Sequence, residues 1–388
     1  MSVIKYRELK RRYELDGPRK TVEHLSEALR NHDLKPEDFS IRDLAEALIP
    51  NGRQWVSELN PADSGAVTLT ESFEGVDVTA FMNLTGQLVY SKILESYLSD
   101  IFTLSKIVST IPTRLNGEKI PGTTGIKDAN IEIPAGMPYP NMGFSEDYIE
   151  TPSTTKRGLI VPVTREAVFF DRTHLILSRA AEVGELLALN KEKRIADMIT
   201  GLSSIYNWKG QSYDTYYAGT GDDPWKNMLV SNELTDVTSV ENAISVFSES
   251  LDPYTEEPIL IEGDTILVMP KKQFTAYEVL RSQEILCVNN VLRTVASPFS
   301  RYKIVVNRIA YRQLTKSNPA LADDFAKYWY IGNFSKAFAY MENWPITVTQ
   351  SMSGSEADFS QDIIIRFKAS ERGTPAVLNP RYVVKCTG

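Results

Sequence analysis

The sequence predicts an α+β fold, and three stretches carry that prediction. Residues 106–157 are rich in Gly, Pro and Thr around short apolar pairs, residues 171–201 keep a helical pattern, and the last fifty or so residues are strand-rich. Connections inside compact domains are typically about 4–6 residues long. The first stretch is therefore too long to be a mere connector.

The first 65 residues predict a small helical appendage. Helices are expected over residues 21–30 and 41–48, with Thr21 and Ser40 as their N-caps. Residues 60–65 would link this appendage to the main body. A further apolar helical stretch follows over residues 81–104.

The excursion at residues 106–157 predicts two β-strands joined by a wide tip. Its β-prone and turn-forming residues are Ile107, Val108, Ile111, the dipeptides Asn116-Gly117 and Pro121-Gly122, Ile131, Ile133, and residues 159–163. An isolated hairpin is at best marginally stable in water. We therefore expect it to pack either on the rest of its own domain or on a neighbouring subunit.

A long helix is predicted next, capped by Asp171 and closed by Gly201. Its length of about 28 residues gives a rod on the order of 40 Å, although Gly184 is unfavourable inside a helix. Residues 203–236 predict an ordered loop rich in aromatic residues. The later elements are a helix over 237–250, strands over 265–269, 302–307 and 328–331, a helix over 271–281, and strands over 337–341, 346–350, 362–368 and 381–385.

Composition excludes several classes of protein. The 388 residues contain no long apolar window and no signal-peptide core, so we expect neither a membrane span nor export by that route. Cys287 and Cys386 give no disulfide framework, which favours a reducing site of synthesis. The net charge of −8 argues against a main surface that clamps nucleic acid, but it fits a wall that encloses nucleic acid.

The sequence offers no catalytic, cofactor-binding or metal-binding residues. His24, His32 and His174 stand in no metal-ligand spacing with the two cysteines, and no phosphate-binding Gly-rich loop or nucleophile elbow is present. The adjacent carboxylates are more typical of solvated surface than of acid-base chemistry: Asp222-Asp223, Glu256-Glu257 and Asp323-Asp324. We therefore expect a protein that is not an enzyme and needs no cofactor.

Four segments resemble the major capsid proteins of tailed bacteriophages (Caudoviricetes), which share the Hong Kong 97 fold. They are TKRGLIVPVTREAVFFDRT, ILVMPKKQFTAYEVL, WYIGNFSKAFAYMENWPITVTQ and QDIIIRFKASERGTPAVLNPRYVV, and with the order of elements they extend the likeness over residues 70–386. The resemblance implies a helical N-terminal region at 1–65, an N-arm at 66–105, an extended β loop at 106–163, an axial domain at 251–331, and a peripheral domain at 164–250 plus 332–388 with a spine helix at 172–200.

The resemblance also implies a function. The chain would assemble with itself into hexamers and pentamers, forming an icosahedral capsid around packaged double-stranded DNA that is enclosed without sequence-specific reading. Its other partners would be a portal, a scaffold or a maturation protease, with no membrane. The source would be a phage, a prophage or a gene-transfer particle, with synthesis in the bacterial host cytoplasm and a final place in the virion. Some relatives remove the N-terminal region during maturation, whereas retention is the expectation here.

Two other functions remain open at this point. One is an encapsulin-like compartment for cargo enzymes, which shares the fold. The other is an enzyme or ligand-binding protein whose pocket would be lined by aromatic residues of one loop: Trp208, Tyr213, Tyr216, Tyr217 and Trp225. Aromatic residues in that number more often pack a long loop onto its domain.

Some relatives join subunits through a covalent bond between a loop lysine and an asparagine. The lysines available in the excursion and the candidate acceptors are Lys119, Lys127 and Lys156, and Asn333, Asn343 and Asn379. No particular pair stands out from the sequence.

Overall fold

The computed structural model describes most of the chain and divides it into two compact units. The described residues are 11, 15–16, 20–21, 23–25, 27–29, 31, 34–49, 52–59, 76–121, 148–203, 206–221, 223–251, 258–281, 298–352 and 361–388. Unit 1 comprises Met1–Asp100, Lys156–Asn190 and Trp344–Arg372, and unit 2 comprises Ile101–Thr155, Lys191–Asn343 and Gly373–Gly388.

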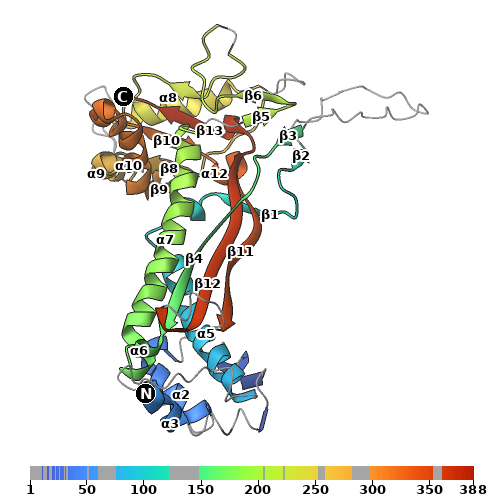
Figure 1. The fold of residues 1–388 in the computed structure, drawn as a ribbon. Coiled ribbons are helices and arrows are strands. Elements are labelled where there is room, and N and C mark those ends of the chain that lie inside the picture. The colour runs from blue at the N-terminus through green and yellow to red at the C-terminus, as the bar shows by residue number, and fades with distance from the viewer. Residues whose placement is uncertain are drawn as a thin grey trace, which may run out of the picture. The chain divides into compact units, whose positions relative to one another are not determined.

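The predicted α+β class is confirmed by the mixture of helices and sheets (Figure 1). The domain boundaries predicted at residues 65, 105, 163, 250 and 331 stay a prediction. The two units are compact groups of contacts, and four elements, β4, α7, β11 and β12, supply residues to both. Several expectations lie outside the described residues: the tip of the excursion with Lys127, Ile131 and Ile133, as well as His32, Asp222, Glu256, Glu257 and Cys287.

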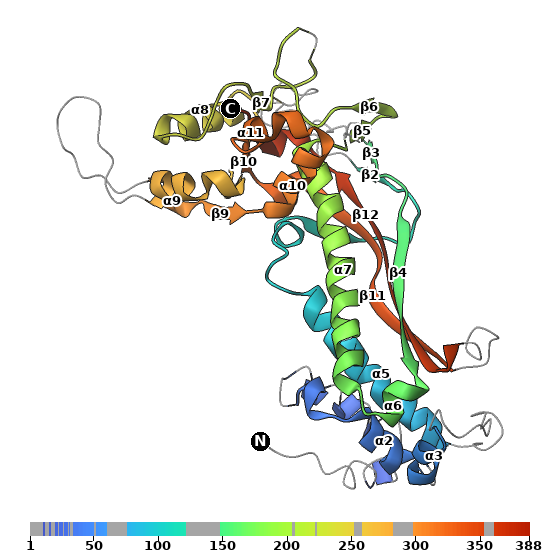
Figure 2. The same ribbon diagram turned by 60° about the vertical axis from the view of Figure 1, so that its left-hand side comes forward.

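Unit 1 contains the N-terminal helices together with helices from later parts of the chain (Figures 1 and 2). They are α2 (Ile41–Leu48), α3 (Gly52–Glu58), α5 (Val76–Tyr97), α6 (Arg165–Phe169) and the first part of α7 (Thr173–Thr200). Ser40 caps α2 as predicted, with its side chain accepting the Asp43 N–H at 3.1 Å. The sequence interpretation missed α3.

The N-terminal helices contribute to the core of unit 1, and the helical appendage predicted at residues 1–65 stays a prediction. The ring of Trp55 on α3 stands edge-on to that of Phe81 on α5, with 6.4 Å between centroids. The Ile41 N–H donates to the hydroxyl of Thr173 at 2.8 Å. Asp171 does not act as a simple cap of α7; its carboxylate accepts from the hydroxyls of Ser40 and Thr173, each at 2.8 Å.

Helix α7 runs from Thr173 to Thr200 and confirms the predicted long helix. Gly201 ends it with a φ of +80°, and the Gly201 and Leu202 N–H groups close the last turn on the carbonyls of Met198 and Asp197. Gly184 has a packing reason, because a Cβ there would collide with the carbonyl oxygen of Ile93 on α5. The glycine therefore allows two helix backbones to approach closely.

Two long strands form the middle of a four-stranded sheet with the order β1-β11-β12-β4. The bounds are β1 (Ser109–Pro112), β11 (Phe338–Met352), β12 (Ile363–Val377) and β4 (Thr155–Thr164). β1 pairs in parallel with the first part of β11, from Ser109 opposite Ala339 to Pro112 opposite Glu342. The strands predicted at 337–341 and 346–350 are one continuous strand, and the strand predicted at 362–368 extends to Val377.

Unit 2 contains a five-stranded sheet with the order β7-β13-β10-β8-β9. Its strands are β7 (Met228–Leu229), β13 (Val383–Cys386), β10 (Trp329–Gly332), β8 (Thr265–Val268) and β9 (Lys303–Val306). The strands predicted in this region are confirmed to within a few residues. β8 pairs in parallel with β9 and antiparallel with β10.

Both faces of the five-stranded sheet are covered, which explains why β8 and β10 are buried at every position. Ile266 and Trp329 point into a core shared with α8 and α9, whereas Leu267 and Tyr330 point into a core shared with α7 and α10. The helices of unit 2 are α8 (Val237–Ser248), α9 (Gln273–Arg281), α10 (Arg308–Ser317), α11 (Ala322–Phe325) and α12 (Phe334–Ala337).

Short 3₁₀ turns complete the described elements: Pro36–Asp38, Leu104–Lys106, Pro270–Lys272, Pro298–Arg301, Pro319–Leu321 and Pro380–Tyr382. Within the described ranges, none of the helices combines the length and apolar character that a bilayer crossing requires.

The glycine in α7 provides a test of helix packing. At an exposed helix position Gly→Ala would stabilise by about 1 kcal/mol, but Gly184→Ala should lower the free energy of unfolding by about 1–3 kcal/mol because the methyl group collides with Ile93. Urea denaturation of the unassembled chain measures this. Ser178→Ala on the exposed side of α7 is the matched control and should be close to neutral. A Gly184→Ala chain as stable as the wild type would contradict this packing.

Candidate assembly surfaces

The base of the excursion is a small sheet inside unit 2 with the order β2-β3-β5-β6. Its strands are β2 (Lys119–Pro121), β3 (Tyr148–Glu150), β5 (Tyr206–Trp208) and β6 (Gln211–Tyr213). All three pairings are antiparallel. We expected the excursion to pack either on its own domain or on a neighbouring subunit. Its base packs on its own domain, because the aromatic loop contributes the third and fourth strands of this sheet.

Side-chain bonds fix the point where the excursion leaves the domain. The Asn116 carboxamide oxygen accepts the N–H of Thr154 at 2.9 Å, and the Thr151 hydroxyl accepts the N–H of Glu118 at 2.8 Å. Gly117 has a φ of +84°, as the predicted turn requires. The two strands thus begin from a turn that is held on both sides.

The charged residues of this base are paired across the strands. Lys119 lies 3.1 Å from the Glu150 carboxylate and 4.4 Å from the centre of the Tyr148 ring. The hydrogen bond to Glu150 raises the pKa of Lys119. An ammonium group held in this way is a poorer nucleophile than a free amine.

The asparagines considered as acceptors of a covalent bond have structural roles. The Asn333 and Asn379 side chains accept the backbone N–H groups of Lys336 and Arg381, both at 3.1 Å. Asn343 donates to the carbonyl of Leu115 at 3.0 Å. The covalent link stays a prediction.

The aromatic rings of the loop pack on one another. The Trp225 ring has its centroid 5.5 Å from that of Tyr206, 5.6 Å from that of Tyr213 and 5.2 Å from that of Tyr217. The Arg381 guanidinium lies 4.9 Å from the Trp225 ring centre. Pairs of this kind contribute about 0.5–1.5 kcal/mol each beyond their buried area, so the loop is held firmly.

Two further contacts join this loop to its surroundings. The Tyr216 hydroxyl donates to the carbonyl of Ile199 near the end of α7 at 2.6 Å, and the Asn227 carboxamide donates to the carbonyls of Thr215 and Pro380, each at 2.9 Å. A cavity of about 230 Å³ borders Trp225 and Arg381. The loop residues thus pack their domain.

A buried carboxylate connects α7 to the start of the excursion and to α10. Glu192 is fully buried, and its carboxylate accepts the N–H groups of Leu104 at 2.6 Å and Ser105 at 3.0 Å. Asn307 donates to it at 3.1 Å and also caps α10 by accepting the Ala310 N–H at 2.7 Å. Burial raises the pKa of Glu192, although these hydrogen bonds oppose the rise.

Large apolar side chains are exposed at several places on both units, and those on α9 and β4 are two of these places. On α9 of unit 2, Phe274 is 83% exposed and Tyr277 is 45% exposed, while Ala276, Val279 and Leu280 on the other side of the helix are buried. On unit 1, β4 forms the edge of its sheet and exposes Leu159 and Ile160. An uncovered sheet edge with apolar side chains is a template for contact with another chain.

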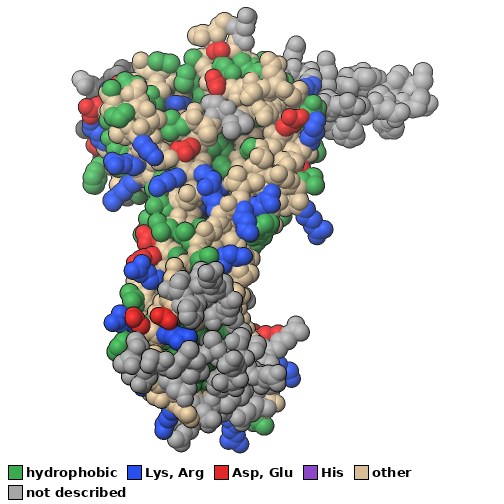
Figure 3. Space-filling view, viewed as in Figure 1, with side chains coloured by type: hydrophobic (Ala, Val, Ile, Leu, Met, Phe, Trp, Pro, Cys, Tyr) green, Lys and Arg blue, Asp and Glu red, His purple; other side chains and the backbone are tan. Residues whose placement is uncertain are grey.

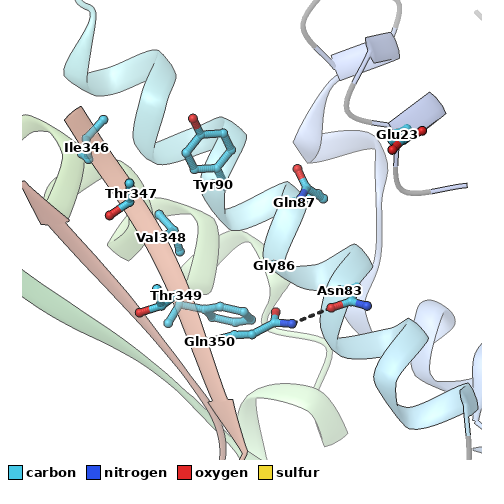
Figure 4. Close-up of a pocket in the computed structure, with 11 residues that line it drawn as sticks. Glu23, Asn83, Gly86, Gln87, Tyr90, Ile346, Thr347, Val348, Thr349 and Gln350 are labelled. Carbon is cyan, nitrogen blue, oxygen red and sulfur yellow. Dashed lines mark hydrogen bonds between the residues drawn. The ribbon is translucent and has the colours of Figure 1, made fainter. Parts of the chain in front are cut away.

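A groove of about 840 Å³ lies in unit 1 between α5 and the part of β11 beyond its pairing with β1 (Figure 4). Gln350 on β11 donates to the Asn83 carboxamide on α5 at 2.6 Å. The strand contributes residues 346–350, and the helix contributes Asn83, Gly86, Gln87 and Tyr90. Among the described lining residues, Glu23 is the only carboxylate.

Within the described ranges, no three His, Cys, Asp or Glu side chains come together as metal ligands would. His24 and His174 are exposed in unit 1, and Cys386 is buried in unit 2, where burial raises the pKa of its thiol to about 12. Asp323 pairs with Lys271 at 3.3 Å.

The described surface therefore offers faces suited to contact with other macromolecules. A family model described as phage capsid protein matches residues 148–386, more than half of the chain. The chain therefore belongs to the phage capsid protein family, and it is a capsid protein that forms the shell. The resemblance seen in the sequence is confirmed.

Several solved structures are similar to this chain. The virus-like particle from Pyrococcus furiosus is 12% identical, with 77% of this chain and 97% of that chain covered and a TM-score of 0.41. The capsid of a native GTA particle is 12% identical, with 75% and 91% covered and a TM-score of 0.43. Mycobacterium phage Ogopogo is 13% identical, with 74% and 91% covered and a TM-score of 0.41. No curated protein matches. The family assignment rests on the family model.

The buried carboxylate predicts a large loss of stability on truncation. Glu192→Ala leaves the N–H groups of Leu104 and Ser105 and the Asn307 carboxamide without their acceptor, and each unsatisfied buried donor costs about 1–3 kcal/mol. We expect the free energy of unfolding to fall by about 3 kcal/mol or more in urea denaturation of the unassembled chain. Glu185→Ala on the exposed side of α7 is the control. A loss below about 1 kcal/mol would show that water replaces the carboxylate.

The same group predicts a dependence of stability on pH. The pKa of Glu192 in the folded state lies above its ordinary value of 4.5, so the folded chain binds more protons than the unfolded chain between these two values. Its contribution to stability is therefore fully present below pH 4.5 and is lost as pH rises through the folded pKa. The unfolding free energy of the wild type minus that of Glu192→Gln should decrease as the pH rises from 4.5 to the pKa of Glu192 in the folded chain. A difference that stays constant or increases with pH would contradict the raised pKa.

Proposed function

We propose that the chain assembles into hexamers and pentamers that close an icosahedral shell around packaged double-stranded DNA. The observation that carries this proposal is the pair of unlike apolar surfaces, Phe274 with Tyr277 on α9 and Leu159 with Ile160 on β4. Two unlike surfaces on one subunit favour head-to-tail contacts, and such contacts close into rings when the rotation between subunits permits. Helix α9 lies within residues 251–331, which are expected to form the axial domain around the ring axis.

The excursion supports the same proposal. Its base is built into the sheet of β2, β3, β5 and β6, and the bonds of Asn116 and Thr151 set the direction in which the two strands leave. A segment anchored so firmly at its root is suited to contact a neighbouring subunit. In this proposal the subunit has a structural role with no enzymatic activity, it is made in the bacterial host cytoplasm, and it meets a portal, a scaffold or a maturation protease during assembly into the virion.

Substitution of the exposed phenylalanine tests the assembly. Phe274→Asp should leave the fold intact, because Phe274 is 83% exposed, but it should prevent capsomer formation by placing a charge in the ring contact. Size-exclusion chromatography and electron microscopy of the overexpressed chain measure this. Val230→Asp, at an exposed apolar residue after β7, is the matched control and should assemble. Shells of normal size from Phe274→Asp would contradict the role of α9.

A second variant tests the excursion. Replacement of residues 122–147 by a short Gly-Ser linker keeps β2 and β3, so the base sheet should form while the shell should not. The nucleic-acid content of wild-type particles tests the cargo. Particles filled with protein and free of DNA would contradict DNA packaging and would favour the encapsulin-like alternative.

A further inference from the structure

A row of cations lies on the exposed side of α10 in unit 2. Arg308, Arg312 and Lys316 occur at intervals of four residues and are all exposed, whereas Ala310 and Leu314 on the other side of the helix are buried. Four residues advance a helix by about 6 Å and slightly more than one turn. The three side chains therefore form one stripe, and α10 contains no acidic residue to interrupt it.

Helix α7 adds a fourth cation to this surface. Gln313 on α10 donates to the Asp197 carboxylate on α7 at 2.8 Å, which holds the two helices together. Burial raises the pKa of Asp197, while the bond from Gln313 and the charges of Lys316 and Lys193 oppose the rise. Lys193 and Lys316 therefore lie around the same carboxylate. Figure 3 shows Lys and Arg side chains gathered over the region of α10 and α7.

The four cations, Lys193, Arg308, Arg312 and Lys316, are called the basic stripe below. Among the described residues, no carboxylate lies within ion-pair distance of any of them. Three other cations of unit 2 are paired: Lys226 with Glu249 at 3.1 Å, Lys271 with Asp323 at 3.3 Å, and Lys327 with Asp324 at 3.8 Å. In a chain of net charge −8, a row of cations without an ion-pair partner among the described residues is a feature to explain.

We propose that the basic stripe contacts the phosphate backbone of packaged double-stranded DNA and so marks the face of unit 2 that points into the shell. This inference rests on the proposed function. Phosphate contacts need only clustered positive charge and carry no sequence information, as a wall around an arbitrary genome requires. None of the large apolar residues of α10 is exposed. Because the centre of a protein–protein interface is usually apolar, this surface is less suited to a protein partner than to DNA.

The test compares two variants of equal charge with the wild type. R308Q/R312Q/K316Q removes three cations of the stripe, and K226Q/K271Q/K327Q removes three paired cations elsewhere in unit 2. Both change the net charge from −8 to −11. Binding of the unassembled full-length chain to a 30-base-pair duplex is measured by fluorescence anisotropy at 50 and 150 mM salt.

Four phosphate contacts give a slope of about −3.6 in log affinity against log salt, which corresponds to a loss of about 50-fold between these two concentrations, whereas the single contact left in the stripe variant gives a loss of about 3-fold. We expect that loss for the wild type and for the paired-lysine control, and little salt dependence for the stripe variant. Equal binding by all three chains would overturn the inference. Loss of binding to polyglutamate without loss of binding to DNA would also overturn it, in favour of an acidic protein partner.

Two measurements separate this inference from the proposed function. Electron microscopy should show that the stripe variant still forms shells; absence of shells from the wild type would refute the proposed function itself. The cysteine of K316C should not react with a large polymeric maleimide in intact shells, and it should react once the shells are disrupted. Wild-type shells are the control, because they measure the reaction of the native cysteines alone. Reaction in intact shells would place the stripe on the outside and overturn the inference.

Discussion

The arrangement of unit 2 depends on one buried negative charge. Taking a carboxylate out of water costs several kcal/mol unless hydrogen bonds replace its hydration, and Glu192 meets that condition with donors from Leu104, Ser105 and Asn307. Those donors belong to the turn that begins the excursion and to the cap of α10. A single side chain on α7 therefore sets where the excursion starts and how the helix with the basic stripe is oriented.

The surfaces available to other molecules follow from what the five-stranded sheet needs to bury. The sheet takes one side of α9 and one side of α10 to cover its two faces, so the opposite sides of these helices must be exposed. On α9 that side carries Phe274, and on α10 it carries Arg308 and Arg312. One layer of helices thus presents an apolar face, and the other presents a charged face.

The sequence predicted elements whose signal is local. The apolar spacing up to Gly201 predicted α7, and the apolar runs predicted β8 and β10. The single strand β11 was divided in two because Pro345 interrupts its pattern; the structure tolerates that proline beyond Glu342, where the pairing with β1 has ended. Glu192 could not be predicted, because two of its partners lie 88 and 115 residues away.

The N-terminal helices bear on how such a subunit could mature. Trp55 covers Phe81, Leu44 and Val56 are fully buried, and Ile41 is bonded to Thr173. A protease that cut after residue 65 would remove one wall of the unit 1 core and leave Phe81 in water. Loss of that wall would cost several kcal/mol by transfer of apolar area alone. Removal of the first 65 residues would therefore lower the folding stability of the cleaved subunit, and something else would have to cover α5 afterwards.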